Sequence, residues 1–126
     1  MSDGSLLIML GLVIKHFVAD FLLQFSWMIE EKGQLNRFGG YAHAAVHGAG
    51  TAIWLWIYGL GVASIIALAL AEVAVHYAID FTKARTTDHI SSTAQPRLFW
   101  GLYGLDQLLH HLTYLVLTYL VVSVSI

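Results

Sequence analysis

Residues 62–81 read VASIIALALAEVAVHYAIDF, an almost continuous apolar run that is interrupted by Glu72, His76 and Asp80. About 20 largely apolar residues form a helix that is long enough to cross the roughly 30 Å of hydrocarbon in a bilayer. The three ionisable residues recur at every fourth position, so they share one face of that helix. The stretch therefore predicts a membrane-spanning helix with one polar face.

The composition of the chain also indicates a membrane protein. Of the 126 residues, 58% are hydrophobic and only 11% are charged, whereas a soluble domain of this size needs more polar surface. The chain has no cysteine, which excludes thiolate metal sites and cysteine nucleophiles. A net charge of −2 and a pI near 6.3 argue against a nucleic-acid partner.

Three further apolar stretches predict an all-α polytopic membrane protein with four transmembrane helices in a single domain, residues 1–126. The predicted spans are residues 6–28, 41–58, 62–81 and 101–122. Basic residues occur only in the loop between the first two spans and in the loop between the last two, apart from Lys15. The positive-inside rule therefore places both loops in the cytoplasm and both termini on the non-cytoplasmic side.

Short motifs repeat along the chain. The segment HFVADF at residues 16–21 is matched by HYAIDF at 76–81, and His43 with His47 is matched by Asp106 with His110. We therefore expect two duplicated helical hairpins, related by a pseudo-twofold axis along the membrane normal. The alternative is chance similarity between short apolar segments.

Each predicted span carries polar side chains four residues apart, and all four stripes fall in the same layer of the membrane. A charged group near the bilayer centre costs at least about 2.5 to 3.5 kcal/mol, whereas a polar contact between helices returns about 0.6 kcal/mol. The layer is therefore expected to face inward and to be neutralised by Lys15, protonated histidines, water or metal ions.

A metal site is the favoured interpretation, because imidazoles and carboxylates on facing helices can bind a divalent cation. Nitrogen and oxygen ligands suit zinc, manganese or iron, and there are enough candidates for two ions. The alternative is a metal-free hydrogen-bonded or proton-conducting network. The predicted ligands are His16, Asp20, His43, His47, His76, Asp80, Asp106 and His110.

Glu72 and Asp106 are the predicted catalytic carboxylates, either of which could act as a general base. For Glu72, a structural carboxylate held by Lys15 is an equal alternative. Lys32, Lys83 and Arg85 lie where anionic lipid headgroups or a phosphate would be, but a role as topology signals is the favoured explanation of all three.

The chain resembles an uncharacterised family of small bacterial integral membrane proteins, a domain of unknown function. The matching segments cover nearly the whole chain: HFVADFLLQFSWM at 16–28, Lys32, His43, His47, HYAID at 76–80, Lys83 and DQLLH at 106–110. The resemblance implies a four-span protein of the bacterial inner membrane. It implies functional positions at Asp20, Gln24, Lys32, His43, His47, His76, Asp80, Lys83, Asp106, Gln107 and His110, but no reaction.

These observations favour a membrane-embedded metal-dependent hydrolase that acts on a lipid or another amphipathic substrate near the cytoplasmic leaflet. The first alternative is a metal-ion or proton transporter or channel, and the second is a haem-binding electron carrier. Membrane lipids are the expected partners, and the chain could also form a homo-oligomer.

Overall fold

The computed structural model describes residues 3–124, which form helices and their connections, with no strand in this range. Helix α1 continues directly into a turn of π-helix, η1, and a short helix α2 precedes three long helices. The elements are α1 (Asp3–Phe17), η1 (Val18–Leu22), α2 (Ser26–Glu31), α3 (Gly39–Tyr58), α4 (Val62–Thr87) and α5 (Pro96–Val124).

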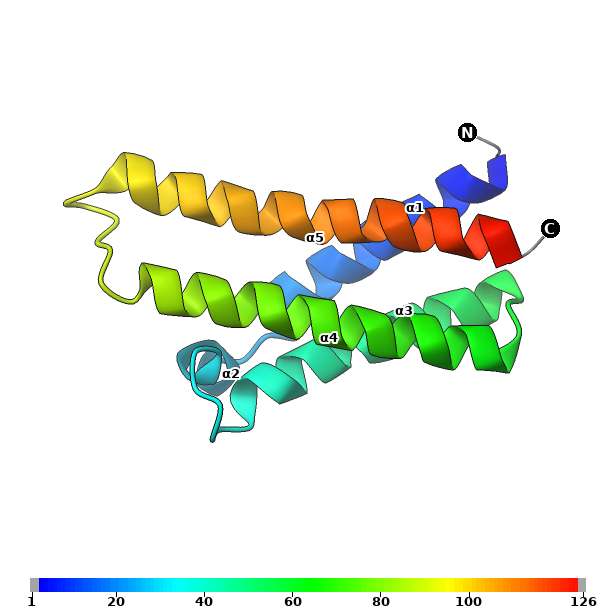
Figure 1. Cartoon of the computed structure of the whole chain (residues 1–126), viewed down its shortest axis with the longest axis horizontal. Coiled ribbons are helices and arrows are strands. Elements are labelled where there is room, and N and C mark those ends of the chain that lie inside the picture. The colour runs from blue at the N-terminus through cyan, green and yellow to red at the C-terminus, as the bar shows by residue number, and fades with distance from the viewer. Residues whose placement is uncertain (1–2, 125–126) are drawn as a thin grey trace.

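The four longer helices pack into a bundle (Figure 1). Both α1 and α4 pack against α3 and against α5, so α1 and α4 occupy opposite corners of the bundle. The start of α1, the end of α5 and the α3–α4 turn lie at one end, and α2 and the α4–α5 loop lie at the other (Figure 1). Gly59 makes the α3–α4 turn possible, because its positive φ of 93° is accessible to glycine without strain.

The interior of the bundle differs between its two ends. Toward the chain termini the core is apolar and includes Ile8, Leu12, Leu55, Ile65, Leu68, Tyr114, Leu117 and Val121. Toward α2 the buried side chains are mostly histidines and acids. The predicted polar layer is therefore a real feature of one half of the bundle interior.

Three helical stretches are long and apolar enough to cross a membrane: Gly4–Leu22, Val62–Thr87 and Pro96–Val124. Their outward surfaces carry many exposed leucine, isoleucine, valine and aromatic side chains, as lipid-facing helices do. Helix α3, which corresponds to the predicted span 41–58, is not among them. Besides Ala44 and Leu55, its buried face consists of three glycines, two histidines and a threonine.

The helix boundaries differ from the sequence prediction at two places. The first span was predicted to run to residue 28, but its helix ends at Leu22, and Phe25 has an extended backbone before α2 begins. Helix α4 continues to Thr87, beyond the predicted span 62–81, and α5 begins at Pro96, before the predicted span 101–122. Proline suits that first helical position, since its missing N–H would have no partner there.

Candidate metal centre

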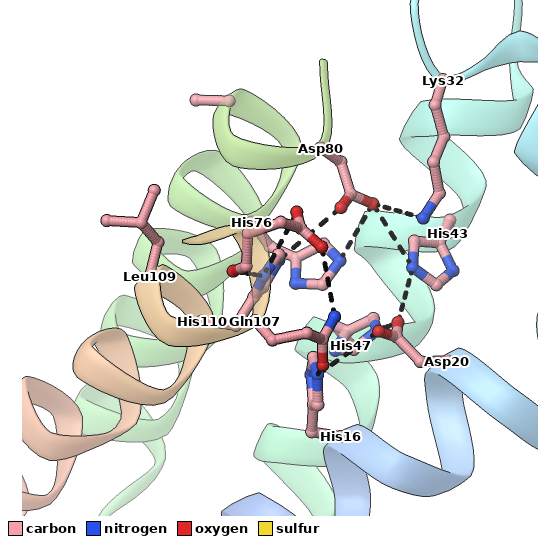
Figure 2. A network of polar contacts seen from close by, with 12 residues as sticks. His16, Asp20, Lys32, His43, His47, His76, Asp80, Gln107, Leu109 and His110 are labelled. Carbon is pink, nitrogen blue, oxygen red and sulfur yellow. Dashed lines mark hydrogen bonds and ion pairs between the residues drawn. The ribbon is translucent and has the colours of Figure 1, made fainter. Parts of the chain in front are cut away.

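The polar layer brings the predicted ligands together from every long helix. Figure 2 shows the histidines and acids pointing toward one another in the bundle interior. Seven of the eight predicted ligands are buried, and Asp20 is half-buried. They come from α1 and η1 (His16, Asp20), α3 (His43, His47), α4 (His76, Asp80) and α5 (Asp106, His110).

One group of possible metal ligands surrounds Asp20. Its carboxylate oxygen Oδ1 lies 3.0 Å from His47 Nε2 and 3.1 Å from His43 Nε2. With His76, these residues offer four ligand atoms that all lie within 4.8 Å of one another. Asp20 sits in the π-helical turn η1, a local geometry that often occurs at functional sites.

A second group is centred on Asp80 and adjoins the first. His76, Asp80 and His110 offer three ligand atoms within 4.8 Å of one another. Asp80 Oδ2 lies 3.3 Å from His76 Nε2 and 3.4 Å from His43 Nε2, so Asp80 connects the two groups. His76 belongs to both, and its Nε2 atom can bind only one ion at a time.

The spacing of the atoms around Asp80 Oδ2 suits a divalent metal ion. Two atoms that bind one zinc ion tetrahedrally at about 2.0 to 2.2 Å lie roughly 3.3 to 3.6 Å apart, and the Asp80 contacts to His76 and His43 are 3.3 and 3.4 Å. Among the described residues, both ring nitrogens of His43 and His76 lack an aligned hydrogen-bond partner. Buried imidazoles are normally hydrogen-bonded, so these buried His and Asp groups could hold a metal ion.

His110 is oriented toward the layer by its own helix. Its Nδ1 atom lies 2.8 Å from the backbone carbonyl oxygen of Asp106. A carbonyl only accepts hydrogen bonds, so Nδ1 carries the proton and Nε2 is left with a free lone pair. That atom lies 3.7 Å from Asp80 Oδ1. A backbone contact of this kind fixes the tautomer of many metal-binding histidines.

His16 takes part in a different set of contacts. Gln107 donates from Nε2 to Asp106 Oδ2 at 3.1 Å, so its Oε1 faces His16 Nε2, also at 3.1 Å. His16 Nε2 therefore carries a proton, and Tyr114 donates its hydroxyl to Nδ1 at 2.9 Å. Because His16 Nε2 also lies 3.3 Å from Asp20 Oδ2, this arrangement orients Asp20, and the ligand role of His16 stays a prediction.

A small polar cavity reaches the layer from the α2 end of the bundle. Its volume is about 50 Å³, which is enough for a water molecule. The acids Asp20, Asp80 and Asp106 line it together with Lys32 and Lys83. Phe21, Gln24, Tyr103 and Gln107 complete the lining. Asp106 thus borders the cavity, while its predicted role as a metal ligand or base stays a prediction.

Glu72 lies on the other side of His47, away from this cavity. It forms an ion pair with Lys15, and its Oε1 is 4.0 Å from His47 Nδ1. Lys15 Nζ also lies 3.4 Å from the backbone carbonyl oxygen of His47 and 3.3 Å from the hydroxyl of Tyr114. These contacts match the alternative in which Lys15 holds Glu72 as a structural carboxylate.

Two residues have larger roles than the sequence suggested. Lys32, read there chiefly as a topology signal, is buried and lies 2.7 Å from Asp80 Oδ2. Tyr114 was not singled out, although it is 1% exposed and its hydroxyl contacts His16. Its position one helical turn after His110 repeats the spacing that defined the stripes and could have identified it.

Comparison with known proteins identifies the family of the chain but no reaction that it catalyses. No curated protein and no solved structure matches the chain. A family model described as "Protein of unknown function (DUF3307)" matches residues 7–126, which include every residue of the polar layer. The chain therefore belongs to the DUF3307 family of proteins of unknown function.

Proposed function

We propose that the protein is a membrane-embedded, metal-dependent hydrolase whose His–Asp layer holds one or two divalent cations. The observation that carries the proposal is the small cavity, because the three acids that line it also contact the histidines of the layer. A site of this kind offers ligands for a cation and room for water in the same place.

We further propose that α3 is the fourth membrane span. It has 20 residues, lies against α4, and is joined to it by a short turn. Its outward residues Ile53, Trp56 and Ile57 are strongly exposed, which suits a lipid environment. Four spans and the basic loops favour the bacterial inner membrane, with both termini on the non-cytoplasmic side.

The duplication of the two hairpins remains part of this proposal. The repeated His-x-x-x-Asp motifs have matching geometry, because the distance from Nε2 to Oδ2 is 3.3 Å both in His16–Asp20 and in His76–Asp80. The bundle also places α1 and α4 at opposite corners, as a twofold axis between hairpins requires.

In the proposed mechanism the chain positions water and substrate around Asp106. A bound cation would polarise the bond to be broken and make a water molecule more acidic. Asp106 borders the cavity, its Oδ1 has no hydrogen-bond partner among the described residues, and Gln107 orients its other oxygen. Asp106 is therefore placed to accept a proton from water.

The hydrolysis step follows from that placement. The water oxygen bonds to the carbon or phosphorus of an ester or phosphoester, and the bond to the leaving oxygen breaks. Asp106 returns the accepted proton to the leaving oxygen. Lys32 and Lys83 border the cavity and offset negative charge that develops there.

The alternatives to an enzyme are less well supported. A transporter needs a polar path across the membrane, but the bundle beyond the layer is filled by an apolar core. A haem needs space between its axial histidines, whereas the rings of His47 and His76 stack with their centroids 3.7 Å apart.

The proposal is tested by measuring metal bound to the purified, untagged protein. We expect bound metal in the wild type and its loss in His47→Ala, His76→Ala and Asp80→Asn. His89→Gln is the matched control, because His89 lies in the α4–α5 loop and is 93% exposed. Unchanged metal stoichiometry in all three variants would contradict the proposed metal centre, and with it the proposed hydrolase activity.

A further inference from the structure

Lys83 borders three cavities of different character at the α2 end of the bundle. One is the small polar cavity that contains Asp106. Another is apolar and lies between α4 and α5, and the third is a larger polar cavity between the end of α4 and the loop that follows α2. We infer that the substrate of the proposed hydrolase is a lipid with a phosphate headgroup, an inference that rests on the proposed function.

The apolar cavity suits a hydrocarbon chain. It has a volume of about 430 Å³, and Val75, Ile79, Leu105 and Leu109 are among its lining residues. Val75, Leu105 and Leu109 are also 40–49% exposed on the outer surface of the bundle, where a membrane-spanning protein contacts lipid. A chain can therefore enter this cavity sideways from the bilayer.

The larger polar cavity suits an anionic headgroup. It has a volume of about 550 Å³ and is lined by Lys32, Lys83 and Arg85, with Glu30 and Asp88 as the acids. In the described part of the chain, neither Lys83 nor Arg85 forms an ion pair with a carboxylate, although Lys83 lies over the ring of Tyr103. Two cations without a carboxylate partner favour a phosphate, which accepts several charge-assisted hydrogen bonds.

The three cavities together specify an amphipathic ligand and its orientation. Asp106 lines both the apolar cavity and the small polar one. A lipid with its chain between α4 and α5 and its phosphate near Lys83 therefore brings the bond between headgroup and chain next to Asp106. Lys83 would therefore lie near the hydrocarbon chain, the phosphate and the bond between them.

Binding to detergent-purified protein, measured by native mass spectrometry, tests the inference. The probes are dioleoyl phosphatidic acid, dioleoylglycerol, which lacks the phosphate, and glycerol 3-phosphate, which lacks the chains. We expect phosphatidic acid to bind at least about tenfold more tightly than either, since one charge-assisted hydrogen bond contributes more than the about 1.4 kcal/mol that a factor of ten represents. Equal binding of dioleoylglycerol or of glycerol 3-phosphate would overturn the inference.

Variants separate the two parts of the binding site. Lys83→Gln is expected to weaken phosphatidic acid binding about tenfold, and Lys83→Arg to restore it. Ala78→Phe is also expected to weaken phosphatidic acid binding about tenfold, because its ring fills the apolar cavity, which Ala78 lines. The matched controls are Arg97→Gln and Ala67→Phe, at exposed positions that line none of the three cavities. Wild-type binding by Lys83→Gln or Ala78→Phe would overturn the inference.

Metal content, measured on the same samples, distinguishes this failure from failure of the proposed function. Lys83 and Ala78 belong to neither group of metal ligands, so both variants are expected to retain wild-type metal, which also shows that they fold. If metal is retained but phosphatidic acid does not bind preferentially, the lipid substrate is contradicted and the proposed metal centre is not. Preferential binding by a protein that contains no metal supports the lipid site and contradicts the hydrolase.

Discussion

At the scale of single residues, the ion pair between Lys15 and Glu72 is buried, with side chains that are 9% and 1% exposed. Removing one partner leaves a buried charge without compensation, which costs about 3 to 5 kcal/mol. We expect Lys15→Met and Glu72→Leu each to lower the free energy of unfolding by this amount. The double variant should recover most of it, because a buried ion pair can often be replaced by apolar side chains of similar volume.

A double-mutant cycle in detergent, monitored by circular dichroism, measures that coupling. The double variant is also expected to keep its bound metal, because Glu72 belongs to neither group of metal ligands. Additive losses in the cycle would contradict the pairing. Loss of metal from a stable double variant would instead give Glu72 the functional role that the sequence first suggested.

The hydroxyl of Tyr114 provides the next test at this scale. It donates to His16 Nδ1, and His16 in turn contacts Asp20. Tyr114→Phe keeps the buried ring but removes this hydrogen bond, so we expect metal affinity to fall about tenfold, as for other residues that orient ligands. Competition with a chelator measures the affinity. Tyr119→Phe, 72% exposed on the same helix, serves as the control, and equal affinities for both variants would contradict the orienting role.

At the scale of the elements, regular helices are what the sequence predicts well. The spacing of four residues identified polar faces on the predicted spans, because a helix of fixed pitch brings such positions together whatever surrounds it. The π-helical turn at Val18–Leu22 was not predicted, since no residue type marks it. The contacts of Lys32 with Asp80 and of Tyr114 with His16 were also missed, because they depend on how whole helices pack.

The packing of α3 against α4 depends on Gly48, which follows His47 in the chain. A Cβ atom at this position would overlap Cγ2 of Val73 and lie 3.3 Å from the carbonyl oxygen of Ala69. Valine is stiff about its first side-chain torsion and the carbonyl belongs to the backbone, so α3 would have to move away from α4. That movement would separate His47 from His76.

We therefore expect Gly48→Ala to destabilise the protein by about 1 to 3 kcal/mol and to weaken metal binding. Gly104→Ala is the matched control, because a Cβ atom there meets nothing within 4 Å, and alanine favours a helix by about 1 kcal/mol. Thermal unfolding and metal content, measured on both variants, check the expectation. Equal behaviour of the two variants would show that the close approach of α3 and α4 is not needed.

At the scale of the whole molecule, the side of the membrane that each end of the bundle faces depends on whether α3 crosses the membrane. The α3–α4 turn lies at the opposite end of the bundle from α2 and the α4–α5 loop (Figure 1). If all four helices span, residues at these two ends must face opposite sides of the bilayer. If α3 does not span, the loop before it and the turn after it face the same side.

The absence of cysteine from the sequence makes this distinction directly measurable with single introduced cysteines. Asn36→Cys and Ser92→Cys place a thiol at exposed positions near α2 and in the α4–α5 loop, and Gly61→Cys places one in the α3–α4 turn. With a membrane-impermeant maleimide added to intact cells, we expect labelling of Gly61→Cys only, because the positive-inside rule puts the basic loops in the cytoplasm. Ser92→Cys and Asn36→Cys should react only after the membrane is opened. Labelling of Asn36→Cys and Gly61→Cys from the same side would contradict the fourth span and with it the common layer to which α3 contributes His43 and His47.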